Sequence, residues 1–246
     1  MVQNVKDVIG KSRLGVGQIL SRAWSLWRDN FWTIFWITLI VYIPVNVILY
    51  FVPEPQSLGD FRVYLRVIQI LEFFIGILAT MAVAFFVDAR IHGKSLEYKD
   101  SLKKSLSRWH LLIGTGLLQG LFLLGLFILL IVPGIIFSVY WSFTLFAVAL
   151  RNEKWKSAMD YSKSLVSGRW WSVFGYLLAF GIIALFVTGI AGFLSGFFFG
   201  FVEYFVPRNI VFDVISNLVV DVASSFFTVV SVLFFLNLES TKMKKK

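Results

Sequence analysis

The chain of 246 residues contains no cysteine and little charge. Without cysteine, a disulfide framework, a thiol nucleophile and a cysteine-ligated metal are all excluded. Charged residues make up only 15% of the chain, whereas an ordinary soluble domain has about 25%. So few polar side chains cannot cover a surface in water, which excludes a soluble enzyme and a disordered protein.

The chain is instead rich in apolar residues, which make up 58% of it and give a mean hydropathy of +0.80. A helix needs roughly 20 apolar residues to cross a bilayer. The apolar runs predict an all-α integral membrane protein with six transmembrane helices, at about residues 31–52, 65–87, 111–132, 133–150, 170–192 and 209–238. No cleavable leader is evident in residues 1–29, so we expect the first span to act as its own insertion signal.

Residues 111–150 form one apolar run that is interrupted only at Pro133 and Gly134. A single helix of that length would be about 60 Å long, roughly twice the thickness of the bilayer core. Proline suits the first turn of a helix and glycine suits a turn, so the sequence predicts a hairpin that turns at these two residues. The hairpin either crosses the bilayer twice or is re-entrant, and the flanking charges fit both arrangements.

The basic residues are distributed very unevenly between the two predicted sides. Of 23 lysines and arginines, only Arg62, Arg66 and Arg208 fall outside the N-terminal segment, the 88–110 and 151–169 connections and the C-terminal tail. The positive-inside rule then places both termini in the cytoplasm and the chain in the cell membrane. The net charge of +9 is explained by topology and by anionic lipid on the cytoplasmic side, and no nucleic-acid partner is expected.

An amphipathic segment precedes each odd-numbered span, at about residues 16–28, 98–109 and 155–166. Apolar residues spaced by three and four with basic residues opposite are typical of a helix that lies among lipid headgroups. The alternative is a helix packed against other protein, which favours the same pattern. Tryptophans expected at this cytoplasmic lipid interface are Trp24, Trp27, Trp109, Trp155, Trp170 and Trp171.

The second and third segments also match each other at a fixed offset of 61 residues. Arg108 and Trp109, for example, correspond to Arg169 and Trp170. The chain is therefore predicted to be a single membrane domain, 1–246, built from three hairpin units at about 14–92, 96–153 and 155–240. Parallel repeats occur in transporters, but a repeat alone does not fix a function.

Spans two and six carry polar residues where lipid would disfavour them. In span six, Asp213, Asn217 and Asp221 recur every fourth residue on one face, and span two carries Gln69 and Glu72. A charge in a membrane is costly, so these residues must face protein or water. One hypothesis is an outward-opening polar cavity that binds a cation, a proton or a lipid headgroup through Glu72 and Asp221. The alternative is purely structural hydrogen bonding between helices.

Small-residue ladders are a further feature, and they allow helices to approach closely. We expect them to pack within one chain more readily than between two. The ladder residues are Gly116, Gly120, Gly192, Gly196 and Gly200.

Acid–base chemistry has little support in the sequence. Asp88 and His92 are four residues apart, and His110 borders span three, but no third and fourth metal ligand is evident at a suitable spacing. No nucleophile elbow, phosphate-binding loop or zinc motif occurs. We therefore expect no catalytic residue, no metal, no cofactor and no enzymatic activity.

Residues 96–180 carry the segments LIVPGII at 130–136, RNE at 151–153 and GRWW at 168–171. In these segments the chain resembles the multi-pass proteins related to the membrane domain of some glycerophosphodiester phosphodiesterases. The resemblance implies a six-span membrane domain, and it lies outside the catalytic barrel, so it implies no phosphodiesterase activity and no active-site residue.

The sequence thus favours a non-catalytic protein that organises the membrane, associates with lipid or accompanies a membrane-protein partner. The alternative is a small transporter or channel that uses the intramembrane acids of spans two and six. A hydrated cavity enclosed by these two spans would favour transport.

Overall fold

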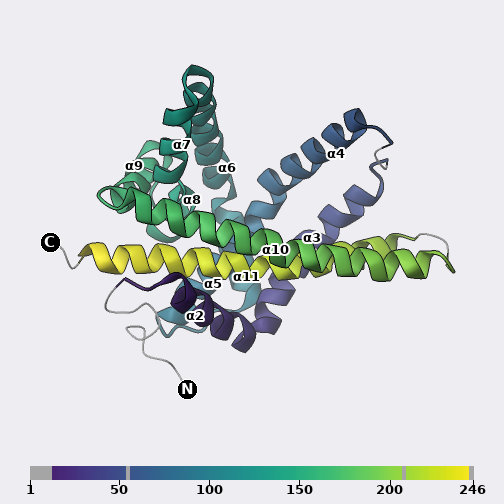
Figure 1. Ribbon diagram of the computed structural model, residues 1–246. Helices are drawn as coiled ribbons and strands as arrows, with labels where there is room; N and C mark the ends of the chain where they lie inside the picture. Colours follow the sequence, from purple (N-terminus) through teal and green to yellow (C-terminus); the bar gives the residue numbers. More distant parts are fainter. Residues whose placement is uncertain (1–12, 54–55, 207–208, 244–246) are drawn as a thin grey trace.

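The computed structural model describes residues 13–53, 56–206 and 209–243. Within these ranges the chain is helical and contains no strand. Figure 1 labels the helices. Their bounds are α2 Val16–Asp29, α3 Phe31–Tyr50, α4 Leu58–Leu71, the π-helix η1 Glu72–Gly76, α5 Ile77–Ile91, α6 Tyr98–Leu129, α7 Ile131–Tyr140, α8 Thr144–Arg151, α9 Trp155–Val166, α10 Trp170–Glu203 and α11 Ile210–Met243.

Six helical stretches of the described chain are long and apolar enough to cross a membrane, which indicates a multi-pass membrane protein. Several of these helical stretches are longer than the spans predicted from the apolar runs of the sequence. The second runs from Leu58 to Ile91, and the fifth continues from Trp170 to Val202 rather than ending near Gly192. Glycine and phenylalanine in the 193–203 segment do not stop a helix, so α10 continues beyond the end of the predicted span.

The hairpin within residues 111–150 turns at a different residue from the one predicted. The break falls at Leu130, which is extended with φ −157° and ψ 130°. Pro133 and Gly134 lie instead in the first turns of α7, where the proline removes an N–H that would have no partner within the helix. An added Cβ at Gly134 would lie 2.4 Å from Cδ1 of Phe127, so glycine lets α6 and α7 approach.

Of the three predicted amphipathic helices, only two are separate elements. α2 and α9 each end before the following span begins. The segment at 98–109 is not separate, because α6 is one helix of 32 residues from Tyr98 to Leu129. No glycine or proline interrupts the junction near residue 110, so the helix simply continues into the apolar run.

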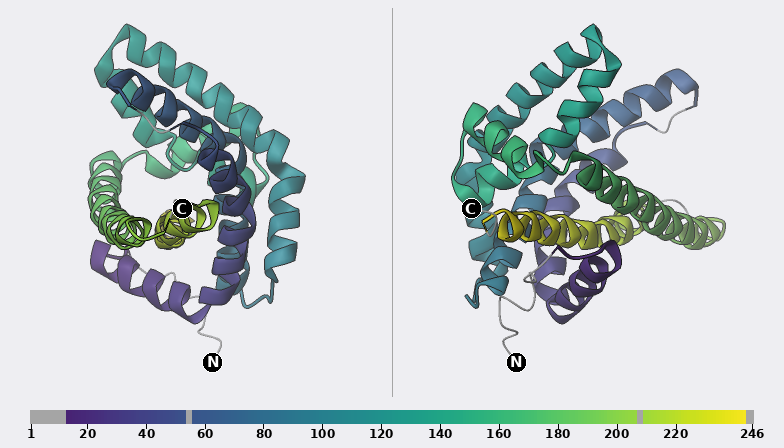
Figure 2. Two further views of the ribbon diagram at one scale, coloured as in Figure 1. Left: turned by 90° about the vertical axis from the view of Figure 1, so that its right-hand side faces the viewer. Right: turned by 60° about the vertical axis from the view of Figure 1, so that its left-hand side comes forward.

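Three hairpins leave a common end of the molecule and point in different directions (Figures 1 and 2). They are formed by α3 with α4, by α6 with α7, and by α10 with α11. We call the common end, where α2, α8, α9 and the C-terminal parts of α5 and α11 meet, the base. α11 contacts α2, α3, α5, α9 and α10, so it is the central helix of the fold.

Most of the hydrophobic core lies in the base. Its large, fully buried side chains include Phe86 of α5, Phe143 before α8 and Phe235 of α11. Toward the far ends of the hairpins, large apolar side chains are exposed, such as Leu129 at 76% and Leu185 at 72%. Apolar surface of this extent is stable in lipid and unfavourable in water.

Only some of the glycines in the predicted ladders lie close to another helix. An added Cβ at Gly116 would lie 3.1 Å from the ring of Phe73, and one at Gly192 would lie 3.7 Å from Val220. At Gly120, Gly196 and Gly200 an added Cβ would have nothing in the described chain within 4 Å beyond its own helix turn. At these three positions the predicted packing is not seen within one chain, because the hairpins diverge there.

Candidate functional site

A polar cavity of about 180 Å³ lies between α3, the α4–η1 segment and α11. We call it the outer cavity. At about 30 Å³ for each molecule, it has room for roughly six waters. Its lining residues are Tyr42, Val45, Asn46, Leu49, Tyr64, Ile68, Glu72, Asn217, Val220 and Asp221.

The outer cavity brings together three of the five polar residues that the sequence singled out for this site. Glu72, Asn217 and Asp221 line it, although Glu72 and Asp221 come from different hairpins. Gln69 and Asp213 do not line it. Gln69 is exposed on another face of α4, because the cavity side of that helix is set by Tyr64 and Ile68.

Two residues of α3 donate hydrogen bonds to the carboxyl groups of Glu72 and Asp221. The Tyr42 hydroxyl donates to Oε2 of Glu72 at 3.1 Å, and Nδ2 of Asn46 donates to Oδ2 of Asp221 at 2.8 Å. Tyr42 and Asn46 are four residues apart, so they lie on the same face of α3. Neither Tyr42 nor Asn46 was predicted as a site residue from the sequence. In the sequence, these two residues are distinguished only by being polar and four residues apart within an apolar run.

The π-helical turn η1 sets the position of Glu72. Gly76 ends this turn, and an added Cβ there would lie 2.0 Å from Oε2 of Glu72 and 3.2 Å from the Tyr42 oxygen. The glycine therefore leaves the space that the carboxyl group occupies. The carbonyl of Phe74, within the same turn, accepts a hydrogen bond of 2.6 Å from Nε1 of Trp109. Single π-helical turns within helices occur frequently at functional sites.

Neither acid of the cavity is paired with a basic residue of the described chain. Among the ion pairs of the described chain, none includes Glu72 or Asp221. Tyr42 and Asn46, which bind the two acids, supply a neutral phenol and a neutral amide. Since both residues lie within membrane-spanning helices, an ionised carboxyl group at either position would need a further positive charge to offset its burial.

A second cavity of about 20 Å³ lies closer to the base, and we call it the inner cavity. Tyr42 and Asp221 line both cavities, so these two residues lie where the cavities adjoin. About one water molecule fits a volume of this size. The lining residues are Thr38, Tyr42, Ala79, Thr80, Val83, Asp221, Ser224, Ser225 and Thr228.

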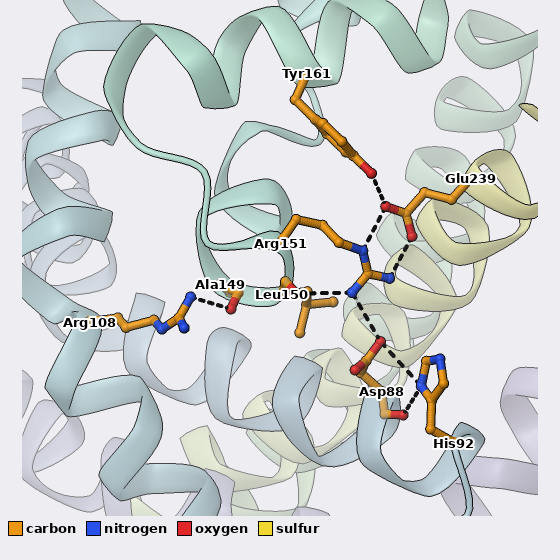
Figure 3. Close-up of polar contacts among 8 residues, drawn as sticks. All are labelled: Asp88, His92, Arg108, Ala149, Leu150, Arg151, Tyr161 and Glu239. Atoms are coloured by element: carbon orange, nitrogen blue, oxygen red, sulfur yellow. Dashed lines mark hydrogen bonds and ion pairs between the residues drawn. The ribbon is translucent and has the colours of Figure 1, made fainter. Parts of the chain in front are cut away.

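A network of polar and charged residues joins α5, α8, α9 and α11 at the base (Figure 3). Arg151 donates from Nε to Oε1 of Glu239 at 2.8 Å and from Nη2 to Oε2 at 2.6 Å. The Tyr161 hydroxyl also donates to Glu239, while Asp88 lies 3.6 Å from Nη1 of Arg151 and 3.6 Å from Nδ1 of His92. Burial, followed by the contact with Glu239, raises the pKa of Tyr161.

This network accounts for two of the three residues considered for acid–base chemistry. Asp88 and His92 are neighbours, whereas His110 is exposed on α6. In the described ranges no group of three or more histidine, aspartate or glutamate residues is arranged to hold a metal ion. Glu239 and Arg151 connect the ends of α11 and α8, so we assign the network a structural role.

Of the six tryptophans expected at a lipid interface, five lie on α2, on α9 or in the first turn of α10, whereas Trp109 lies further along α6 and contacts η1. Trp24 and Trp171 are 50% and 78% exposed. Others make polar contacts with protein, since Nε1 of Trp27 donates to Ser225 at 3.0 Å and Nε1 of Trp170 donates to the Ile136 carbonyl at 3.1 Å. The Trp155 ring packs over Gly114, where an added Cβ would lie 2.5 Å from it.

Matched positions of the predicted repeat make similar contacts. Arg108 donates to the carbonyls of Val148 and Ala149 at the end of α8, both at 2.9 Å. Arg169 donates in the same way to the Leu238 carbonyl near the end of α11 at 2.7 Å. Arg108 within α6 and Arg169 just before α10 thus each bind a main-chain carbonyl near the C-terminal end of another helix, where a cation is favourable.

Comparison with known proteins gives one match. No curated protein and no solved structure matches the chain. The resemblance to the phosphodiesterase membrane domain therefore stays a prediction. Residues 67–238 match a family described as a domain of unknown function, DUF7847. This match includes both acids of the outer cavity and more than half of the sequence, so the chain belongs to the DUF7847 family.

Proposed function

We propose that this protein is a small cation transporter or channel whose site is the outer cavity. The observation that carries the proposal is that Glu72 and Asp221 line one cavity within the spanning helices and pair with no described basic residue. The proposal is non-enzymatic and uses no cofactor. It favours the alternative that the sequence left open, because the two acids share a cavity.

The energetics of the two carboxyl groups support a cationic ligand. A charge near the centre of a membrane costs at least about 2.5–3.5 kcal/mol. A hydrogen bond to a charged group stabilises it by about 1.5–3 kcal/mol. Glu72 accepts one such bond from Tyr42, and Asp221 accepts one from Asn46. A cation between the carboxyl groups would offset the rest of the cost, whereas an anion would be repelled.

Flux through proteoliposomes tests this proposal. We expect the purified protein to dissipate an imposed gradient of Na⁺, K⁺ or H⁺ faster than protein-free vesicles do. Asp221→Asn should lower the flux about tenfold, corresponding to about 1.4 kcal/mol. Asp213→Asn is the matched control, because Asp213 lies on the same helix and does not line the cavity. Flux no faster than in protein-free vesicles would contradict the proposal.

A second candidate is the lipid-associated, membrane-organising role, and the divergence of the hairpins favours it (Figure 2). The described parts of the base and the N-terminal part of α6 carry most of the described basic residues, including Arg90, Arg108 and Lys163. On this proposal α2 and α9 lie at the cytoplasmic interface of the cell membrane, both termini are cytoplasmic, and anionic lipids bind the base. The exposed hairpin faces would then contact lipid or a partner membrane protein.

Lipid retention and tag accessibility test this second candidate. We expect anionic phospholipid to co-purify with the protein in preference to neutral phospholipid, and the preference to weaken in high salt. A tag fused after Lys246 should react only after the cells are permeabilised. Equal retention of both lipid classes, or a tag that is reachable on intact cells, would contradict this role.

A further inference from the structure

We infer that the cation handled at this site is the proton, and that Asp221 transfers it between the outer and the inner cavity. This inference rests on the proposed function and names its substrate. It is based on the sizes of the two cavities, on the position of Asp221 where they adjoin, and on the hydroxyl groups that line the inner one.

Size distinguishes the proton from other cations at this point. The outer cavity of about 180 Å³ has room for a hydrated ion, but the inner cavity of about 20 Å³ has room for about one water. A metal ion that leaves its hydration shell needs a ring of oxygen ligands to replace it. A hydrated metal ion is larger than the inner cavity, so it could enter only after losing most of its water. A proton needs no such space.

The lining of the inner cavity suits proton transfer. Five of its residues, Thr38, Thr80, Ser224, Ser225 and Thr228, carry hydroxyl groups. A hydroxyl group can donate one hydrogen bond and accept others, so it can both receive and pass on a proton through water. Thr38 donates to the Ile34 carbonyl at 3.0 Å and Ser224 to the Asp221 carbonyl at 2.8 Å. Their oxygens therefore remain available to accept a hydrogen bond from the enclosed water.

Asp221 takes up one proton and releases one proton in each transfer, so the side chain returns to its starting state. Hydronium in the outer cavity gives a proton to the Asp221 carboxylate, so that an O–H bond of hydronium breaks and one to the carboxylate forms. Asn46 donates to Oδ2 at 2.8 Å, which leaves Oδ1 to take the proton. The acid then gives the proton to the water of the inner cavity, and the carboxylate is restored. The other titratable groups that line the two cavities are Tyr42, Tyr64 and Glu72, and Glu72 attracts cations into the outer one.

The test is ion-selective flux in proteoliposomes that contain a pH-sensitive dye, with a potassium diffusion potential as the driving force. We expect wild-type protein to acidify the vesicle interior, and Asp221→Asn to slow this about tenfold. Thr38→Val removes a lining hydroxyl group at nearly constant volume and should slow proton entry several-fold. Thr188→Val is its matched control, because Thr188 bonds only within α10 and lines neither cavity.

The outcomes separate this inference from the proposed function. Flux of Na⁺ or K⁺ that requires Asp221, without proton flux, would overturn the inference and support transport. No flux of any of the three ions would overturn both. Proton flux that is unchanged in both Asp221→Asn and Thr38→Val, each monodisperse in detergent, would overturn the inference. If Asp221→Asn does not fold, Thr38→Val decides alone: slowed entry supports the inference and unchanged entry overturns it.

Discussion

The carboxyl group of Glu72 occupies the space that a side chain at position 76 would need. An added Cβ at Gly76 would lie 2.0 Å from Oε2 of Glu72. The two residues begin and end the π-helical turn η1. The acid of the outer cavity is therefore positioned by a glycine on its own helix and by the Tyr42 hydroxyl across from it.

Gly76→Ala should displace the Glu72 carboxyl group and lower cation flux about tenfold, a change of about 1.4 kcal/mol. Gly120→Ala is the matched control, since an added Cβ there meets nothing within 4 Å. Alanine is a better helix former than glycine by about 0.5–1 kcal/mol, so Gly120→Ala should preserve flux and slightly raise the thermal midpoint. Equal flux in both variants would show that Gly76 does not position the acid.

Removing Glu239 should destabilise the base strongly. The Glu239 side chain is 7% exposed and Arg151 binds it through two nitrogens, so Glu239→Ala leaves a partly buried arginine with only the more distant Asp88 as an acidic partner. The expected loss is about 3–5 kcal/mol, measured as a fall of the unfolding midpoint in detergent. Asp29→Ala breaks the exposed pair of Arg28 and Asp29 and should cost less than about 1 kcal/mol. Similar losses in the two variants would contradict the structural role of Glu239.

Tyr161 should stay protonated at a pH where an ordinary tyrosine ionises. Its pKa is raised above the usual value by burial and by Glu239. The stabilising contribution of the neutral phenol is therefore complete below about pH 10 and is lost as the pH rises above that value. Absorbance of tyrosinate should be the same in wild type and Tyr161→Phe at about pH 10.5. An excess of one full tyrosinate in the wild type would contradict this expectation.

Glu72 and Asp221 should react with a hydrophobic carbodiimide, which modifies carboxyl groups in apolar surroundings when they take up a proton. Both line a cavity within the spanning helices. Asp29, with 59% of its side chain exposed, serves as the internal comparison. Peptide mass spectrometry should find the modification at the two cavity acids and not at Asp29. Modification at Asp29 alone would argue against proton uptake at the cavity acids.

The spans and part of the site could be predicted from the sequence because they depend on local properties. The length of an apolar run determines whether a helix can cross a bilayer, and the four-residue spacing of Asn217 and Asp221 puts them on one face. Glu72 was identified because a charge in an apolar run is costly wherever the helices lie.

The remaining features depend on contacts between distant segments, which no local pattern records. Tyr42 and Asn46 became site residues only because α3 packs beside η1 and α11. The turn at Leu130 could not be separated from one at Pro133, since proline is tolerated throughout the first turn of a helix. The pairing of Arg151 with Glu239 joins residues that are 88 positions apart.

The most direct test of the central claim is the rate of cation uptake by vesicles that contain wild-type protein or the double variant Glu72→Gln/Asp221→Asn at equal protein content. Both substitutions keep the volume of the side chains and remove the two negative charges of the cavity. The account predicts rapid uptake by the wild type and a rate in the double variant equal to that of protein-free vesicles. Equal uptake by the wild type and the double variant would contradict it.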